Sequence, residues 1–195
     1  MSTPAYCRLE DLPEVEPLID AFVEQLPCRA PGPYPEPKVE GMDEQTANLL
    51  LDAFANGGSA ELTAIAQYFQ HSLTITDPVI SNLELCISLS EMKHLDLIGG
   101  LIESLGGKPK YWATNRFYWT GGHVGYGETT SGKVALDIQS EREAIAGYER
   151  LLRQTQHPAV RAVLERILAD EIVHLSLFEQ AYARAKALER GEAGS

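Results

Sequence analysis

The sequence lacks any apolar run long enough to cross a membrane, because its longest apolar stretches fall far short of the roughly 20 residues that a membrane span needs. Basic residues are also scarce: 16 Lys and Arg stand against 28 Asp and Glu, which gives a formal net charge of −12. Nucleic acids and anionic membranes attract proteins through basic surfaces. We therefore expect neither nucleic acid nor a membrane as a partner.

Cysteine is rare, with three residues in the chain, and no C-x-x-C pair occurs, which excludes a zinc finger and a thioredoxin-like motif. Cys86 falls in an apolar helical stretch, so we interpret it as a small core residue. Cys7 and Cys28 could approach each other near the N-terminus. The first residues carry early acids and no apolar core, so a signal peptide is not expected and the predicted location is cytoplasmic. Cytosolic thiols usually stay reduced.

Proline is concentrated near the N-terminus, where residues 1–41 include the stretch PCRAPGPYPEP. Proline has no amide hydrogen and favours extended conformations. We therefore expect residues 1–41 to form an arm that lies on the domain, with one short helix near residues 14–25. Residues 42–190 are expected to form one helical domain, followed by a disordered tail over residues 191–195.

Helical patterns dominate the remaining sequence, and no alternation is long enough to predict a sheet. The pattern TANLLLDAFAN, within residues 43–56, is helical and ends at Gly57 and Gly58. Four longer helices are expected over residues 59–75, 78–105, 134–156 and 158–189. Pro78 and Pro158 stand at the first position of a helix, which tolerates proline. The sequence therefore predicts an all-α fold.

A long connection over residues 106–133 joins the second and third of these longer helices. Its short non-helical core carries five bulky aromatic side chains, Tyr111, Trp112, Phe117, Tyr118 and Trp119. Aromatic surface of this extent is costly to expose to water. We expect it to pack against the chain's own core or against a partner, in a small oligomer that is most simply a homodimer.

An internal repeat determines the expected architecture. When the sequence is shifted by 80 residues, ELTAIAQY at 61–68 matches EREAIAGY at 141–148, and EMKHLDL at 91–97 matches EIVHLSL at 171–177. No gap is needed over this length. The repeat predicts two helical hairpins of the same kind, packed about a pseudo-twofold axis as a four-helix bundle.

Each hairpin carries the same three ionisable side chains on its apolar stripes, at helical spacing. The first helix supplies one glutamate and the second supplies a Glu-x-x-His pair. The six residues are Glu61, Glu91, His94, Glu141, Glu171 and His174. Burying several uncompensated carboxylates would be costly or would force them to take up protons. Two divalent metal ions would supply the missing charge, so the pattern predicts a two-metal site.

The segments ELTAIAQYFQH, SEMKHLDL and ILADEIVHL resemble the corresponding helices of bacterioferritins and rubrerythrin-like proteins, and GGSAEL resembles manganese catalases. The similarity covers about residues 44–108 and 134–185. It implies a ferritin-like four-helix bundle with a long crossover between helices 2 and 3. An inward set of glutamates and Glu-x-x-His pairs marks the di-iron and di-manganese members of this group.

The resemblance also implies a role for each ligand: Glu91 and Glu171 bridge the metals, Glu61 and Glu141 each cap one metal, and His94 and His174 each bind one. Two iron ions are the expected cofactors, with manganese as the alternative, because Glu and His ligands accept both metals. Met92 occupies the place of the haem-binding methionine of bacterioferritins. The E-M-x-H pattern is too short to be specific, so we interpret Met92 as a surface residue and expect no haem.

Candidate catalytic residues follow from spacing. Tyr68 and Tyr148 each lie two helical turns after a capping glutamate, where they would either hydrogen-bond a bridging carboxylate across the bundle or pack with a wet hydroxyl. Asp170 could orient an imidazole, and Ser90 stands at the matching place in the repeat. Because the two halves match in all three ligands, we expect similar environments for both metals.

The expected function is that of a di-iron oxidoreductase that acts on hydrogen peroxide, or on O₂ and Fe(II). A symmetric metal pair favours the two-electron reaction with peroxide. The alternatives are a dimanganese catalase and a non-catalytic iron binding or storage protein. No rubredoxin-like cysteine set is present. Any electron donor would therefore be another protein or a small molecule.

Overall fold

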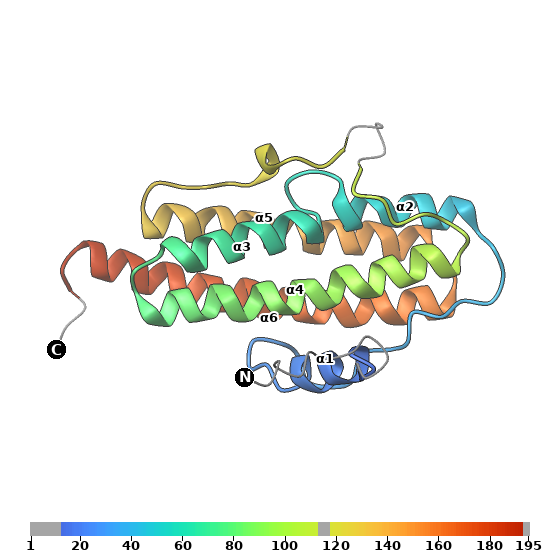
Figure 1. Ribbon diagram of the computed structural model, residues 1–195. Helices are drawn as coiled ribbons and strands as arrows, with labels where there is room; N and C mark the ends of the chain where they lie inside the picture. Colours follow the sequence, from blue (N-terminus) through green and yellow to red (C-terminus); the bar gives the residue numbers. More distant parts are fainter. Residues whose placement is uncertain (1–12, 113–117, 193–195) are drawn as a thin grey trace, which may run out of the picture.

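The computed structural model describes residues 13–112 and 118–192, and within these ranges the chain is helical with no strand (Figure 1). The four long helices are α3 (Glu61–Thr74), α4 (Pro78–Ser104), α5 (Thr130–Gln154) and α6 (Pro158–Glu189). The α3–α4 hairpin packs along the α5–α6 hairpin. The predicted all-α four-helix bundle is thus confirmed, while most of the predicted C-terminal tail lies outside the described residues.

The ends of the long helices follow from local capping. Pro78 and Pro158 begin α4 and α6, as the sequence predicts, and the Asp77 side chain accepts a hydrogen bond from the Ile80 amide. Helix α5 begins earlier than the predicted residue 134. Thr129 explains the difference, since its hydroxyl accepts a hydrogen bond from the Gly132 amide at 3.0 Å and caps a turn that the apolar pattern does not reach.

The long crossover runs back over the bundle from the end of α4 to the start of α5 (Figure 1), and it contains a 3₁₀ turn, η2 (Gly121–His123). Trp119 Nε1 donates to Thr63 Oγ1 at 2.8 Å, and Tyr111 stacks on Phe54 of helix α2 (Glu44–Ala55). Part of the aromatic surface therefore packs on the chain's own bundle. Tyr118 stays 66% exposed, and Phe117 lies outside the described residues. The homodimer stays a prediction.

Two apolar clusters occupy the bundle, one toward each end. The first includes Leu101 of α4 and Leu164 of α6, together with residues of α2. The second includes Ile87 of α4 and Phe178 of α6. Along both helices, the Glu-x-x-His pairs fall between the residues of these two clusters. The apolar packing therefore fixes the middle of the bundle, where the polar side chains meet.

None of the helices in the described ranges combines the length and apolar character that a membrane crossing requires.

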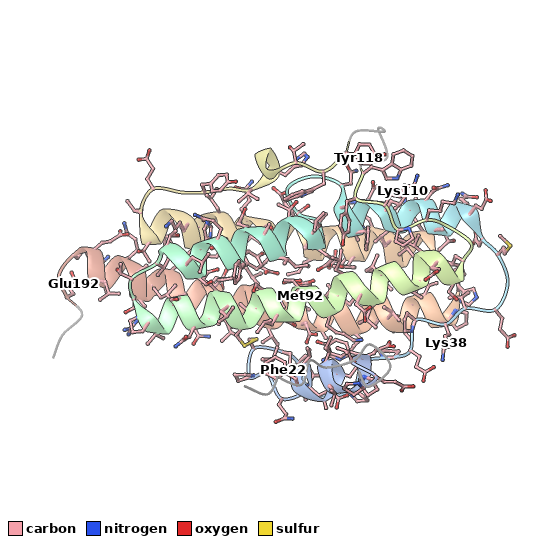
Figure 2. The ribbon with its side chains drawn as sticks, in the orientation of Figure 1. Phe22, Lys38, Met92, Lys110, Tyr118 and Glu192 are labelled. Atoms are coloured by element: carbon pink, nitrogen blue, oxygen red, sulfur yellow. A yellow bond between two sulfur atoms is a disulfide. The ribbon has the colours of Figure 1, made fainter. Side chains whose placement is uncertain are left out.

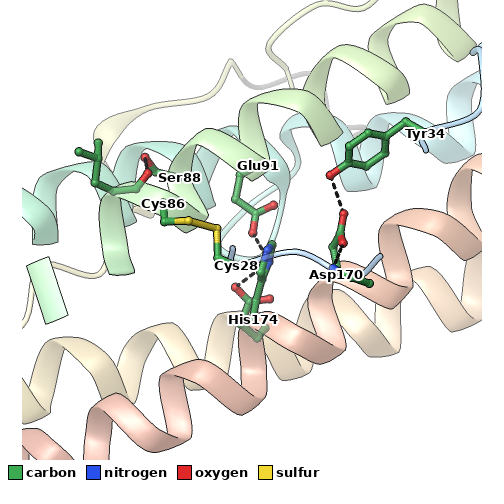
Figure 3. The surroundings of a disulfide bond; sticks show 10 residues. Cys28, Tyr34, Cys86, Ser88, Glu91, Asp170 and His174 are labelled. Atoms are coloured by element: carbon green, nitrogen blue, oxygen red, sulfur yellow. Dashed lines mark hydrogen bonds and ion pairs between the residues drawn. A yellow bond between two sulfur atoms is a disulfide. The ribbon is translucent and has the colours of Figure 1, made fainter. Parts of the chain in front are cut away.

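The N-terminal arm is fastened to the bundle by a disulfide that the sequence interpretation did not anticipate. Helix α1 (Glu16–Val23) lies against the bundle, and the segment after it carries Cys28, which is bonded to Cys86 of α4 with a Cα–Cα distance of 6.2 Å (Figure 3). The bond excludes the possible pairing of Cys28 with Cys7, and it makes Cys86 a disulfide partner rather than only the small core residue of our interpretation. The arm passes directly beside α4, which places the two sulfur atoms within bonding reach. Cys7 lies outside the described residues.

Removing this disulfide is expected to lower the free energy of unfolding. The bond closes a loop with a sequence separation of 58 residues, so it restricts the unfolded chain. We expect Cys86→Ser to cost about 2–4 kcal/mol in urea unfolding. Cys28→Ser removes the same bond from the other side and should cost a similar amount. Equal stability of the Cys86→Ser protein and the wild type would contradict the contribution assigned to this bond.

Candidate metal centre

The structure brings together all six side chains that the repeat singles out, in the middle of the bundle. Each of them is buried, with at most 3% of its surface exposed. Their ligand atoms form two overlapping groups, each within 4.8 Å, and both groups contain Glu91 and Glu171. One group adds Glu61 and His94, and the other adds Glu141 and His174. The four helices therefore present two adjoining half-sites.

In the first half-site, three carboxylates surround the His94 imidazole. His94 Nδ1 lies 2.8 Å from Glu91 Oε2, 3.2 Å from Glu171 Oε1 and 3.6 Å from Glu61 Oε2. Glu61 and His94 come from the first hairpin, whereas Glu171 reaches across from the second. The half-site is thus assembled only when the two hairpins pack.

The second half-site repeats this arrangement around His174. His174 Nδ1 lies 3.0 Å from Glu91 Oε1, 3.1 Å from Glu171 Oε2 and 3.9 Å from Glu141 Oε1. The two imidazole rings are 5.7 Å apart. Glu91 and Glu171 each present one oxygen to each imidazole. Glu61 and Glu141 each face only one imidazole.

Without a cation, the buried glutamates and histidines of the two half-sites have shifted pKa values. Burial and the neighbouring Glu91 and Glu171 raise the pKa of Glu61 well above its usual range, and the pKa of Glu141 is raised for the same reasons. Burial disfavours charge on His174, but the carboxylates around it raise its pKa to about 9. The metal-free protein must therefore hold protons where a metal would otherwise supply positive charge.

The donor set fits a pair of divalent ions. One buried oxygen of each of the four glutamates has no hydrogen-bond partner, and these atoms are Glu61 Oε2, Glu91 Oε1, Glu141 Oε2 and Glu171 Oε1. Unpaired buried carboxylate oxygens are costly unless a cation binds them. Carboxylate and imidazole ligands suit iron and manganese alike. Together with the fold described above, these clusters suggest a di-metal site without deciding between the two metals.

The two tyrosines reach glutamates, but not the ones expected. Tyr68 donates to Glu141 Oε1 at 2.7 Å, and Tyr148 donates to Glu61 Oε1. Each hydroxyl therefore holds the glutamate that faces a single imidazole, across the bundle, rather than one of the two shared carboxylates. Seven residues after a glutamate, a tyrosine lies two turns along its helix, which brings it level with the opposite hairpin's first glutamate. Burial and the nearby carboxylates raise the pKa of Tyr68, so its hydroxyl stays protonated and donates.

Asp170 orients the His94 ring, as its position predicted. Its Oδ2 accepts a hydrogen bond from Tyr34 at 2.7 Å (Figure 3) and lies 3.1 Å from His94 Nε2. Its Oδ1 accepts from Arg166 and from the Ala30 amide. An ionised Asp170 requires His94 Nε2 to carry hydrogen, which leaves Nδ1 free for a metal. The sequence interpretation missed Tyr34, Ala30 and Arg166, and only Arg166, one turn before Asp170 on α6, left a spacing signal.

The second imidazole has no such support. His174 Nε2 and Ser90 Oγ, which stands at the place matching Asp170, are both buried without a hydrogen-bond partner. The two sets of three candidate ligands are thus arranged alike, but the groups around them differ, contrary to the expected similarity of the two environments. The repeat keeps the ligand positions, but Ala30 and Tyr34 of the arm hydrogen-bond Asp170, whereas the Ser90 hydroxyl receives no such contact.

Stability of the metal-free protein is expected to fall as pH rises from about 6.5 to 9. His174 has a folded-state pKa of about 9, above the value of about 6.5 for an unfolded histidine. Its proton therefore stabilises the folded state fully below pH 6.5, and this contribution of roughly 3 kcal/mol is lost by pH 9. Urea unfolding in the presence of a chelator measures the change, with exposed His123→Gln as the control. A stability that rises over this interval would contradict the assignment.

Met92 lies on the outer side of α4 with 54% of its surface exposed (Figure 2), in agreement with its interpretation as a surface residue. The absence of haem stays a prediction.

Comparison with known proteins agrees with this geometry. The family described as "Ferritin-like domain" matches residues 57–187, which is more than half of the chain. A protein of Clostridium acetobutylicum named as a probable manganese catalase is 26% identical over 170 residues, which are 76% of this chain and 75% of that protein. A bacterioferritin of Streptomyces coelicolor is 32% identical over 128 residues, covering 62% of this chain and 72% of the relative.

A solved structure shows the same fold. The crystal structure of a manganese catalase from Anabaena PCC7120 superposes with a TM-score of 0.71 at 24% identity, covering 75% of each chain. The family match over residues 57–187 contains all six side chains, together with α3, α4, α5 and α6 as far as residue 187. The all-helical bundle, the duplicated half-sites and the family match lead to one conclusion: this chain belongs to the family of ferritin-like domain proteins.

Proposed function

We propose that this chain is a di-metal oxidoreductase that acts on hydrogen peroxide. The observation that carries the proposal is the pair of overlapping half-sites, in which Glu91 and Glu171 each face both imidazoles. In the proposed centre these two carboxylates would be shared by a pair of iron or manganese ions, Glu61 and His94 would hold one ion, and Glu141 and His174 would hold the other. When bound, such a pair would exchange two electrons with a small oxidant.

The space beside the centre supports a very small substrate. A cavity of about 10 Å³ touches four of the six side chains, and its remaining lining is mostly small, from Ser59, Ala64, Ser140 and Ala144. A volume of this size accommodates about one water molecule. Of the candidate substrates, small oxidants such as hydrogen peroxide and O₂ come nearest to this size, whereas an organic substrate is far larger. The apolar clusters on both sides of the centre would keep bulk water away from it.

The tyrosines have a proposed role in this reaction. Tyr68 lines the small cavity and holds Glu141, and Tyr148 holds Glu61. We assign them the task of fixing the two capping carboxylates, so that each keeps one oxygen directed at its half-site. Because the single Tyr68 hydrogen is donated to Glu141, the Tyr68 oxygen at the cavity can accept a hydrogen bond from bound hydrogen peroxide.

The test is peroxide turnover by protein loaded with Mn(II) or with Fe(II) in separate samples. We expect O₂ release from hydrogen peroxide by one form, or oxidation of the Fe(II) form by peroxide faster than by O₂ at equal concentration. Glu91→Gln should abolish the reaction, whereas Glu103→Gln, an exposed change on the same helix, should leave it intact. Neither form reacting with peroxide would refute the proposal.

Iron storage is the second candidate, because the bacterioferritin relative has the higher sequence identity, 32%. The two functions differ in the fate of iron. Storage requires Fe(III) to accumulate well beyond the two ions of the centre, inside a large shell of many chains. Iron titration and light scattering on the same sample distinguish the candidates, since a peroxide enzyme would stop at the centre's own ions and form a small oligomer.

A further inference from the structure

A second buried polar cluster lies in the same bundle. It consists of His71 of α3, Glu84 of α4 and Asp137 of α5, each with 0% of its surface exposed. One ligand atom from each side chain lies within 4.8 Å of the others. Along α4, Glu84 precedes Glu91 by two turns, a rise of about 10 Å, so the cluster is separate from the paired centre.

Hydrogen bonds around the cluster hold two of its side chains in place. His71 Nε2 donates to the Gly125 carbonyl at 2.8 Å, which leaves Nδ1 facing Asp137 Oδ2 at 2.9 Å. Gln67 Nε2 donates to the other Asp137 oxygen at 2.8 Å, and Gln67 Oε1 accepts from the Gly125 amide at 2.7 Å. An imidazole whose second nitrogen donates to a backbone carbonyl is the usual arrangement of a metal-binding histidine.

Glu84 completes the cluster with a carboxyl group that receives no hydrogen bond and lies beside the Asp137 carboxylate. Both of its oxygens are buried and have no hydrogen-bond partner. Burial and the Asp137 carboxylate raise the pKa of Glu84 well above its usual range, and the positive charge of Lys133, whose Nζ donates to Thr74 Oγ1, acts in the opposite direction. A carboxylate in this position must either hold a proton or bind a cation.

The fold itself does not require these polar residues. In the 80-residue repeat, His71 matches Leu151 and Glu84 matches Leu164, and both leucines belong to the apolar core at the other end of the bundle. The same positions are thus filled by ordinary core residues in the second hairpin. The polar cluster, which Asp137 of the second hairpin completes, thus stands at one end of the bundle where the other end has apolar packing, and this points to a role other than helix packing.

We propose that His71, Glu84 and Asp137 form a third metal site, which binds one divalent ion independently of the paired centre. His71 Nδ1 and one oxygen from each carboxylate would be the protein ligands, a mixed imidazole and carboxylate set that suits Mn²⁺, Fe²⁺ or Zn²⁺. The two carboxylates balance the charge of the ion. The ion would displace two protons: the one that otherwise lies between His71 Nδ1 and Asp137 Oδ2, and the one that Glu84 otherwise holds.

The test counts Mn(II) ions on the full-length protein after equilibrium dialysis. We expect the wild type to bind one ion per chain more than Glu84→Gln and Asp137→Asn. Glu91→Ala, which targets the paired centre, should keep this single ion and show the electron paramagnetic resonance spectrum of an isolated Mn(II). Exposed Glu103→Gln controls for ions bound loosely at surface carboxylates and should match the wild type.

A further variant guards against a simple failure to fold. Glu84→Leu installs the residue found at the matching place of the repeat, so the bundle is expected to accept it while losing the ion. Equal Mn(II) counts in the wild type, Glu84→Gln and Glu84→Leu would overturn the proposal and would mean that a proton alone satisfies the cluster. Failure of the paired centre to load metal is a separate outcome. The Glu91→Ala protein distinguishes the two, because any ion that it binds belongs to the third site.

Discussion

Glu91→Ala is expected to empty both positions of the proposed paired centre rather than one. Glu91 presents Oε2 to His94 and Oε1 to His174, at 2.8 and 3.0 Å, so each half-site loses a ligand when this carboxylate is removed. The loss also leaves two imidazoles beside fewer negative charges, which weakens the attraction for a second dication. Metal analysis after loading with Fe(II) and removal of the excess should therefore find neither ion of the pair in this variant.

Glu61→Ala provides the contrast. Glu61 faces only the His94 imidazole, at 3.6 Å from Nδ1. The second half-site has its own glutamate in the equivalent place, Glu141. We expect this variant to lose or weaken one ion and to retain the other. Helical content from circular dichroism confirms that each variant is folded before metal is counted. Loss of only one ion from the Glu91→Ala protein would show that this carboxylate does not bridge.

The helices and the six candidate ligands could be predicted from the sequence because both follow strict local periods. A buried glutamate three residues before a buried histidine lies on one face of any α-helix, whatever its tertiary surroundings. The 80-residue repeat then identifies which glutamate of the preceding helix belongs with each pair. Proline correctly predicted the start of α4 and of α6. The predicted start of α5 was too late, because the Thr129 hydroxyl caps an earlier turn.

The arm could not be placed from the sequence because its contacts have no period. Cys28 bonds to a cysteine 58 residues away, and Tyr34 reaches a carboxylate 136 residues away. Nothing in the proline-rich stretch around them indicates which face of the bundle the arm covers. Its position also explains why the two half-sites differ, since Tyr34 and the Ala30 amide hydrogen-bond Asp170 and the Tyr34 ring packs edge-on against His94, whereas the Ser90 hydroxyl has no partner.

The third cluster left a signal that periodicity alone does not interpret. Glu84 lies seven residues before Glu91, on the same stripe of α4, and His71 stands where the repeat has a leucine. Such departures from an apolar pattern are visible in the sequence. Their meaning depends on Asp137 of a third helix, whose approach is set by how the hairpins pack, and packing of that kind has no signature in a single chain.

Asp170→Ala is expected to weaken both the fold and the first half-site. Asp170 accepts hydrogen bonds from Arg166 Nη1 and the Ala30 amide at 2.7 and 2.6 Å, and its other oxygen lies 3.1 Å from His94 Nε2. Burial opposes ionisation of Asp170, but His94 and Arg166 lower its pKa, so it is a carboxylate. Its removal leaves the Arg166 guanidinium, 10% exposed, without its partner.

Breaking a buried ion pair in this way costs about 3–5 kcal/mol, which urea unfolding of the metal-free protein would measure. The His94 ring also loses the acceptor that fixes its orientation, so we expect about 10–100-fold weaker binding at that half-site in a metal titration. Ser90→Ala is the matched control, because Ser90 holds the equivalent place beside the other half-site and its hydroxyl has no partner. We expect Ser90→Ala to leave both quantities close to the wild type. If the two variants lost equal affinity, the arm would have no special effect on the first half-site, and the difference between the two metal environments would lie elsewhere.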